Sequence, residues 1–262
     1  MADLSILIVS HNKPRFAKAA VQTVLDQTHP DWQGILMDSG VLLNQGFFDY
    51  LKDPRLKIIP SGETPEQART SNMASWCFNR LLNSGQVAGE LIMYLNDDDL
   101  LYPDAFETYW NFYQQHDRAP QAMYASQDVG LVGPDGKTQI IGHRVADRPG
   151  GRFGRGRRLD CRVDYLQFCH TAKILDKFRE AYKTTEYHSE DKRDAHHADG
   201  IFMEQIGALT KVYNIDKVLS MNRRTVQSAN LEYSASPLGR LMVLFRAKLR
   251  GARERLFSRR RY

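Results

Sequence analysis

Three consecutive aspartates directly follow an apolar stretch, and this junction constrains the fold of the chain most strongly. Residues 91–95 are short and apolar, as expected of a buried parallel strand, and Asp97, Asp98 and Asp99 follow. Adjacent carboxylates raise one another's pKa unless a cation neutralises them. Oxygen ligands favour Mg²⁺ or Mn²⁺, and Mg²⁺ is commonly held by few carboxylates beside phosphate oxygens. The cluster predicts a divalent-metal site, with a solvated acidic turn capping the next helix as the alternative.

The first hundred residues alternate strand signals with helix signals. Apolar segments predict strands at 4–9, 34–38, 56–59 and 91–95, and spacing and prolines predict helices at 16–25, at 64–84 and from Pro103 onward. This order is typical of an open α/β sheet with parallel strands, whose ligands bind beyond the carboxyl ends of the strands. Asp38 also ends a predicted strand, so we expect two strands to deliver carboxylates to one crevice.

The second half of the sequence is less regular. A turn at 133–136 is predicted to join strand-like segments at 129–132 and 138–142, with a helix at 199–206 and short strands at 212–219. The mixed-charge stretch 188–194 is predicted to be solvent-exposed. Residues 148–158 form a Gly/Arg-rich loop, which is interpreted as a lid over the site or as a plain surface loop. Binding of RNA is disfavoured because this loop contains a single aromatic residue.

Charge is concentrated at the end of the chain. The net charge is +5, yet nine Lys or Arg and one Glu from Arg240 onward carry +8, which leaves −3 elsewhere. This distribution predicts no nucleic-acid partner. Residues 237–262 instead predict a basic amphipathic helix that suits an anionic membrane surface, with packing on the domain or a partner as the alternative.

Cysteines and apolar runs indicate the compartment. Cys77, Cys161 and Cys169 have no Cys-x-x-Cys spacing, which argues against a disulfide framework and a thiolate zinc site. No apolar run approaches the ~20 residues that span a bilayer, and no basic segment precedes the first apolar run as it would in a signal peptide. We therefore expect a cytoplasmic protein, peripheral on the inner face of the cell membrane.

Five ordered motifs stand out along the chain: SILIVSHNKP at 5–14, VLDQT at 24–28, ILMDSG at 35–40, GELIMYLNDDDLLYPD at 89–104 and HADGIF at 197–202. Together they resemble the motifs of family-2 inverting glycosyltransferases, most closely the branch of spore-coat polysaccharide synthesis. The resemblance covers residues 4 to about 225 and is weakest between 125 and 195. It implies a GT-A fold over 1–236, with a nucleotide-sugar-binding half at 1–104 and an acceptor-binding half at 105–236.

The resemblance also implies roles for individual residues. Asp199 would be the general base, Asp98 would contact Mg²⁺ or Mn²⁺, and Asp99 would lie near that ion. The remaining positions would bind the nucleotide-sugar donor: Ser10, His11, Asn12 and Lys13 at the base and ribose, Asp38 at the base, Asn96 and Asp97 at the ribose, and Lys13 with Arg69 at the diphosphate. Two of these residues keep simpler alternatives, a helix N-cap for Asp199 and an exposed helix residue for Arg69.

Two departures from the family pattern weaken the predicted metal site. Thr225 stands where many members have a histidine near the metal, and Asn96 stands where many have aspartate. The function expected is that of a metal-dependent inverting glycosyltransferase, with UDP as the first nucleotide to test and a polysaccharide or lipid-linked hydroxyl as acceptor. The alternatives are a sugar-phosphate nucleotidyltransferase, which usually has a Gly-rich phosphate loop that residues 10–14 lack, and a non-catalytic membrane-associated binding module.

Overall fold

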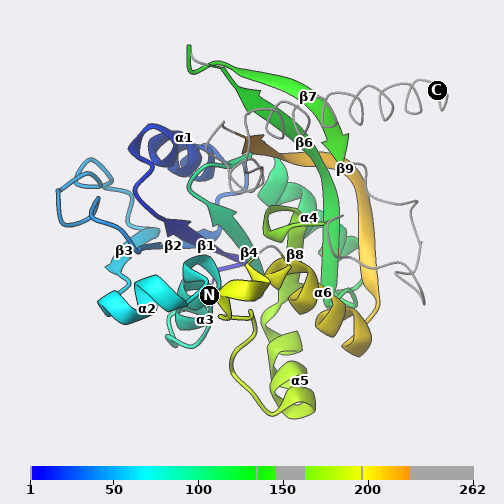
Figure 1. The fold of residues 1–262 in the computed structure, drawn as a ribbon. Coiled ribbons are helices and arrows are strands. Elements are labelled where there is room, and N and C mark those ends of the chain that lie inside the picture. Colours follow the sequence, from blue (N-terminus) through cyan, green and yellow to red (C-terminus); the bar gives the residue numbers. More distant parts are fainter. Residues whose placement is uncertain (1, 134, 145–162, 196, 225–262) are drawn as a thin grey trace, which may run out of the picture.

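A computed structural model of the chain describes residues 2–133, 135–144, 163–195 and 197–224 (Figure 1). Its strands are β1 Leu4–Ser10, β2 Trp32–Asp38, β3 Leu56–Pro60, β4 Leu91–Asn96, β5 Leu100–Leu101, β6 Ala122–Val132, β7 Thr138–Arg144, β8 Phe168–Thr171 and β9 Val212–Arg224. Its helices are α1 Pro14–Leu25, α2 Pro65–Thr70, α3 Met73–Leu82, α4 Ala105–Gln115, α5 Ala172–Tyr182 and α6 Ala198–Leu209, with short 3₁₀ turns at Tyr165–Gln167 and Lys192–Asp194. The predictions for Thr225, for the 148–158 loop and for the 237–262 helix lie outside the described residues.

The first four strands of the chain form the parallel half of the sheet, as predicted. The order is β3-β2-β1-β4, and every neighbouring pair is parallel. The register pairs Ser10 with Asp38 and Val9 with Asn96, so the carboxyl ends of β1, β2 and β4 are level. This alignment positions the residues that follow each strand at one edge of the sheet.

The other half of the sheet brings a second set of strand ends to the same edge. β8 is antiparallel to both β4 and β6, and β9 is parallel to β6, so β6 and β9 run in the direction of β1–β4. β7 returns from β6 as a hairpin, as predicted from the turn at 133–136. β5, which follows the three aspartates, pairs with β9 on the far side of β6. The segment between β4 and β5 therefore links the two halves of the sheet.

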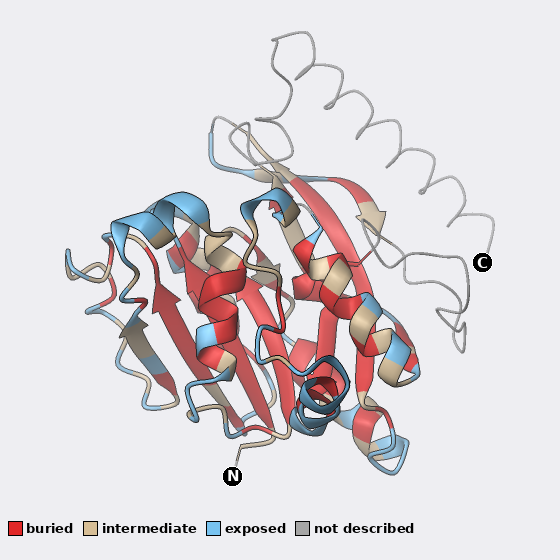
Figure 2. Ribbon diagram, turned by 60° about the horizontal axis from the view of Figure 1, so that its bottom comes forward, coloured by how far each residue is buried: buried red, intermediate tan, exposed pale blue. Residues whose placement is uncertain are grey.

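Both faces of the sheet are buried along its central strands β1, β2 and β4 (Figure 2). Along β1, Ile6 and Ile8 pack into one core cluster and Leu7 and Val9 into the other, as the two-residue period of a strand requires. Helices α1 and α4 complete the first cluster, and α3, α5 and α6 complete the second. Burial on both faces explains why these strands are continuous apolar runs in the sequence. None of the described helices has the length and apolar character needed to cross a membrane.

Three secondary-structure predictions were wrong in extent. The strand predicted at 129–132 is β6, which begins at Ala122 because its first residues pair with β8. The helix predicted over 64–84 is two helices, because Ser71 bridges to Asp191 and the Asn72 amide donates to the Glu190 carbonyl at 2.8 Å. This pairing holds Ser71 in an extended conformation, which ends α2. The short strands predicted over 212–219 form one strand, β9, which continues to Arg224 because it pairs with β6 and β5.

The prediction that residues 188–194 are solvent-exposed was wrong for His188. Its side chain is 0% exposed and lies among the rings of Phe78, Tyr94, Tyr165 and Phe202. Neither ring nitrogen of His188 has a hydrogen-bond partner in the described part of the chain. Burial lowers the pKa of His188 well below its usual range, since the charged imidazole would lose its hydration.

The variant His188→Phe is expected to lose less stability than wild type as the pH becomes acidic. The unfolded chain binds a proton at this histidine near pH 6.5, whereas the folded chain does not, so the free energy of unfolding falls as pH falls below 6.5. One such proton changes it by about 1.4 kcal/mol per pH unit, or about 2 kcal/mol between pH 6.5 and 5. Urea unfolding of both proteins at pH 7 and 5 measures this contribution.

The comparison with wild type is needed because other groups titrate in the same range. The pKa of Asp97 is raised to about 6 in the folded chain. Protonation of this carboxyl therefore stabilises the fold as the pH falls from 6 toward the lower pKa that the carboxyl has in the unfolded chain. Burial lowers the pKa of His170 to about 4, so His170, like His188, reduces the free energy of unfolding as the pH falls. This contribution of His170 is present in both proteins. An equal loss of stability in wild type and His188→Phe would contradict the assignment of a buried neutral His188.

Candidate functional site

The loop after β1 has a fixed backbone at the carboxyl edge of the sheet. Asn12 has a positive φ of 53°, a conformation that asparagine tolerates better than most residues. Its Oδ1 accepts a hydrogen bond from the Val41 amide at 2.9 Å. A Cβ on residue 40 would lie 2.3 Å from that same oxygen, so the close approach of the two loops requires Gly40. The loop that begins at Ser10 is thereby held against the loop that follows β2.

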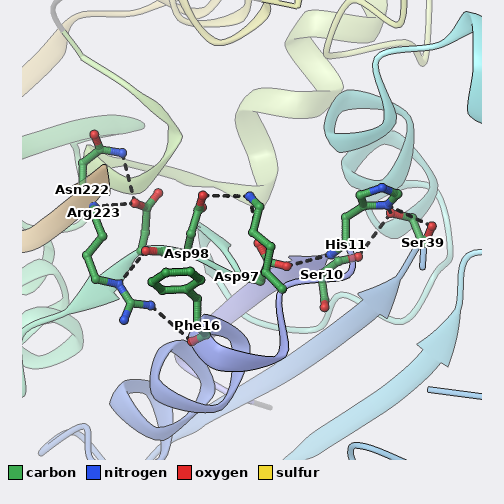
Figure 3. Close-up of polar contacts among 10 residues, drawn as sticks. Ser10, His11, Phe16, Ser39, Asp97, Asp98, Asn222 and Arg223 are labelled. Atoms are coloured by element: carbon green, nitrogen blue, oxygen red, sulfur yellow. Dashed lines mark hydrogen bonds and ion pairs between the residues drawn. The ribbon is translucent and has the colours of Figure 1, made fainter. Parts of the chain in front are cut away.

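His11 connects the carboxyl ends of β2 and β4 (Figure 3). Its amide donates to Asp97 Oδ2 at 2.7 Å, and its ring Nδ1 lies 3.1 Å from both the carbonyl oxygen and the hydroxyl of Ser39. The Asp97 amide in turn donates to the Val9 carbonyl at 3.0 Å. These contacts confirm that the segments after two strands meet in one place, as the sequence predicted.

Lys13 forms ion pairs with the carboxylates of Asp97 and Asp98. Its Nζ donates to Asp98 Oδ2 at 2.7 Å and lies 3.4 Å from Asp97 Oδ1. Burial acts to lower the pKa of Lys13, but the charges of Asp98 and Asp97 raise it overall. Burial raises the pKa of Asp97 to about 6, with the Lys13 ammonium acting in the opposite direction. Lys13 therefore stabilises the two carboxylates that face the loop.

Asp99 points away from Lys13 and toward β9. Its Oδ1 accepts hydrogen bonds from Asn222 Nδ2 at 3.0 Å and from the Arg223 amide at 3.1 Å. Burial, followed by the charges of Asp98 and Asp164, raises the pKa of Asp99 well above its usual range. The third carboxylate thus connects the turn to the other half of the sheet.

A metal site here would rest on few protein ligands. Within the described residues, no group of three His, Cys, Asp or Glu side chains is placed to hold a metal ion. The Asp98 side chain is 20% exposed, whereas Asp97 is 4% exposed and accepts from His11. Asp98, with at most one neighbouring carboxylate, fits the sparse Mg²⁺ or Mn²⁺ site in which diphosphate oxygens and waters supply the other ligands.

Asp38 presents an unsatisfied acceptor at the end of β2. Its Oδ2 accepts from the Leu43 amide at 2.9 Å, while Oδ1 is buried and has no hydrogen-bond partner among the residues that the structure describes. A buried acceptor left without a donor costs about 1–3 kcal/mol. A donor group that reached this oxygen, such as an N–H of a nucleobase, would recover that energy.

The three remaining predicted residues lie on β4, α2 and α6. Asn96 ends β4, and its carbonyl accepts from the Asp99 amide at 3.2 Å. Arg69 is exposed on α2, and its described contact is a main-chain one, from Lys192 Nζ to its carbonyl oxygen at 3.1 Å. Asp199 lies within the first turn of α6 rather than at the N-cap, which is His197, and its Oδ1 accepts from the Gly200 amide at 2.8 Å. The structure thus gives Asp199 no N-cap position.

Two features of the site were not predicted from the sequence. Arg223 contacts the aspartate turn from β9, although its segment was considered only for a metal ligand. Asp164, Gln127 and Arg144 form a second polar group, in which Gln127 Nε2 donates to Asp164 Oδ1 at 2.9 Å and Arg144 pairs with Asp164. The charge of Asp164 contributes to the raised pKa of Asp99, so this group acts electrostatically on the turn. Neither feature has a local sequence signature.

Comparisons with known proteins assign the fold. No protein-family model matches the sequence. Protein CgeD of Bacillus subtilis (strain 168) is 26% identical over 239 residues, which cover 89% of this chain and 53% of CgeD. The chain thus spans about half the length of this curated relative.

Two solved glycosyltransferase structures align with nearly the whole chain. Residues 1–349 of S. aureus TarS in complex with UDP-GlcNAc superpose with a TM-score of 0.64 at 13% identity, over 95% of this chain and 66% of that one. The mannosyltransferase PcManGT from Pyrobaculum calidifontis, in complex with GDP-Man and Mn²⁺, gives 0.53 at 12% identity, over 96% and 64%. The predicted GT-A fold is confirmed.

Proposed function

We propose that the chain is a nucleotide-sugar-dependent glycosyltransferase of the family-2 inverting type. The observation that carries the proposal is the aspartate cluster at the carboxyl end of β4 in a GT-A fold, joined through His11 to the loop at 10–13. Two proteins of similar fold are described as bound to UDP-GlcNAc and to GDP-Man with Mn²⁺. The same edge of the sheet is therefore the place to test for a donor.

The donor would bind across the ends of β1, β2 and β4. Asp38 Oδ1 would accept a hydrogen bond from the nucleobase, and Asp97, which accepts from the His11 amide, would hold the ribose. The loop at 10–13 would line both groups, with Asn96 next to Asp97. Lys13 would neutralise the diphosphate from its place beside Asp98, and Arg69 would reach it from α2. UDP is the first nucleotide to test, followed by GDP and dTDP.

The reaction would be a single displacement. A Mg²⁺ or Mn²⁺ ion held at Asp98, with Asp99 nearby, would stabilise negative charge on the departing nucleoside diphosphate. Asp199 would take the proton from the acceptor hydroxyl as its oxygen bonds to the anomeric carbon. The bond from that carbon to the diphosphate breaks on the opposite face, so the anomeric configuration inverts. Lys13 would remain beside the leaving diphosphate as a fixed positive charge.

A screen of nucleotide sugars by thermal shift, with and without Mn²⁺, tests this function. A ligand that binds only the folded state raises its stability, by about 2.7 kcal/mol at a concentration one hundred times its Kd. We expect one nucleoside-diphosphate sugar to raise the melting temperature more with Mn²⁺ than with EDTA. Stabilisation by a nucleoside triphosphate with a sugar phosphate, and by no diphosphate sugar, would indicate a nucleotidyltransferase instead.

The acceptor and its location form the second part of the proposal. We infer a hydroxyl of a polysaccharide or lipid-linked acceptor at the inner face of the cell membrane, with the basic segment 237–262 binding the anionic surface. Sedimentation with anionic liposomes should be lost when residues 238–262 are deleted. Equal sedimentation of both proteins, or none by the intact chain, would contradict the membrane assignment.

A further inference from the structure

Arg223 joins three segments that are distant in the sequence (Figure 3). It lies near the end of β9 and is 7% exposed. Its Nε donates to the Asp98 carbonyl at 2.6 Å, and its Nη2 donates to the Phe16 carbonyl at 3.2 Å. The guanidinium also lies over the Phe16 ring, 5.1 Å from the centroid. One side chain therefore connects β9, the aspartate turn and α1.

Arg223 is hydrogen-bonded to the main chain of Asp98, and this detail decides what Arg223 does. The Asp98 carboxylate is bonded to Lys13, while its carbonyl oxygen accepts from Arg223. The next residue, Asp99, accepts from the amide of Arg223 and from the side chain of Asn222. The turn is held from behind by β9, which leaves the Asp98 carboxylate directed toward the loop at 10–13.

The chemistry of this position calls for arginine. The planar guanidinium carries donors that point in different directions, so it bonds two separate carbonyls while its flat face lies on a ring. A lysine ammonium is a point charge that cannot reproduce this arrangement. Burying a cation is costly, and here the nearby negative charges of Asp99, Asp98 and Asp97 offset part of that cost. An apolar residue at this position would avoid the cost of burying a charge, yet the chain has an arginine there.

We propose that Arg223 is a positioning residue, which fixes the direction of the Asp98 carboxylate by holding the main chain of its turn against α1. The inference rests on the proposed function, since it assigns Asp98 to a metal-bound diphosphate. A metal site with few protein ligands depends on each of them being held in the binding position in advance, because the waters and diphosphate oxygens that complete the site are mobile. Loss of an outer partner of a metal ligand typically weakens metal binding by about 10–100-fold.

Two measurements on Arg223→Lys test the inference. Amide hydrogen exchange should increase in the peptide that spans 96–101. Without the bond from Arg223 to the Asp98 carbonyl, the turn opens more often and exposes its amides to solvent. Titration calorimetry with Mn²⁺ in the presence of UDP should show affinity about tenfold or more below wild type. The milder variant Phe16→Leu removes the stacked ring, keeps both carbonyl bonds and should give a smaller change in the same direction.

Arg55→Lys is the matched control. Arg55 also lies over an aromatic ring, 4.1 Å from the Trp32 centroid, and donates to a carbonyl, that of Pro30 at 3.2 Å. Arg55 directly precedes β3, so it lies at the amino ends of the parallel strands, whereas the site lies at their carboxyl ends. This variant should leave exchange at 96–101 and Mn²⁺ affinity unchanged.

The outcomes separate the two claims. Unchanged exchange at 96–101 in Arg223→Lys, or raised exchange with wild-type Mn²⁺ affinity, would overturn the positioning role. A wild-type protein that binds no Mn²⁺ with any nucleotide would overturn the proposed metal site, and exchange alone would then decide whether Arg223 holds the turn.

Discussion

Replacing Asp199 with asparagine is expected to lower sugar transfer by about 10²–10⁴-fold while leaving the Kd of the donor unchanged. The amide cannot take the proton from the acceptor hydroxyl, but it keeps the size and hydrogen bonding of the carboxylate. Asp199 lies in the first turn of α6, whereas Asp97 and Asp98 are bonded to His11 and Lys13 from the loop after β1, so donor contacts should persist. Product formation under saturating donor and calorimetric donor binding measure the two quantities.

The control for this variant is Glu204→Gln on the same helix. Glu204 is exposed, so the change removes one negative charge from α6 without touching the site. Near-normal transfer by Asp199→Asn would show that another group accepts the proton. A loss of donor binding in Asp199→Asn would show that the residue serves the donor rather than the acceptor.

Replacing Asp98 with asparagine is expected to abolish the dependence of donor binding on Mn²⁺. Asp98 carries the more exposed of the two carboxylates that face Lys13, so it is the one most open to a metal and a diphosphate. The variant also removes one of the two carboxylate charges that Lys13 neutralises, so the ammonium, still beside Asp97, is more available to the diphosphate. Donor affinity without metal should therefore stay near wild type, while the increase produced by Mn²⁺ disappears.

Asp104→Asn is the matched control for Asp98→Asn. Asp104 is a partly exposed carboxylate six residues along the chain, where it pairs with Lys217 away from the aspartate turn. Its loss should leave the Mn²⁺ effect on donor binding intact. If Asp98→Asn also retained the full effect, the metal would be bound elsewhere, and the assignment of the cluster would be wrong.

The parallel half of the fold could be predicted because each of its signals is local. Continuous apolar runs mark strands that are buried on both faces, and polar residues directly after β1, β2 and β4 mark the edge where they end. The junction between 91–95 and the aspartates was correctly predicted as a strand followed by a turn, and the donor and metal roles of that turn stay predictions. The meeting of this turn with the Ser39 segment at His11 followed from the strand order alone.

The features that were not predicted depend on contacts between segments that are distant in the sequence. The break at Ser71 is imposed by pairing with Asp191, 120 residues later in the numbering, and no helix propensity near Ser71 signals it. His188 lies in a stretch rich in charge, yet its ring is enclosed by aromatic residues from β4, α3 and α6. Arg223 gains its role from the crossing of the β4–β5 segment to β9, which spacing in the sequence does not reveal.

Release of nucleoside diphosphate from a nucleotide sugar tests the central claim most directly. The purified chain is incubated with the donor that stabilises it most, with Mn²⁺ or with EDTA, and with a panel of glycan and lipid-linked acceptors. We predict Mn²⁺-dependent release that is slow without acceptor, faster with one acceptor class, and absent in Asp98→Asn. Binding of the donor with no release under any of these conditions would contradict the enzyme and indicate a non-catalytic nucleotide-sugar-binding module.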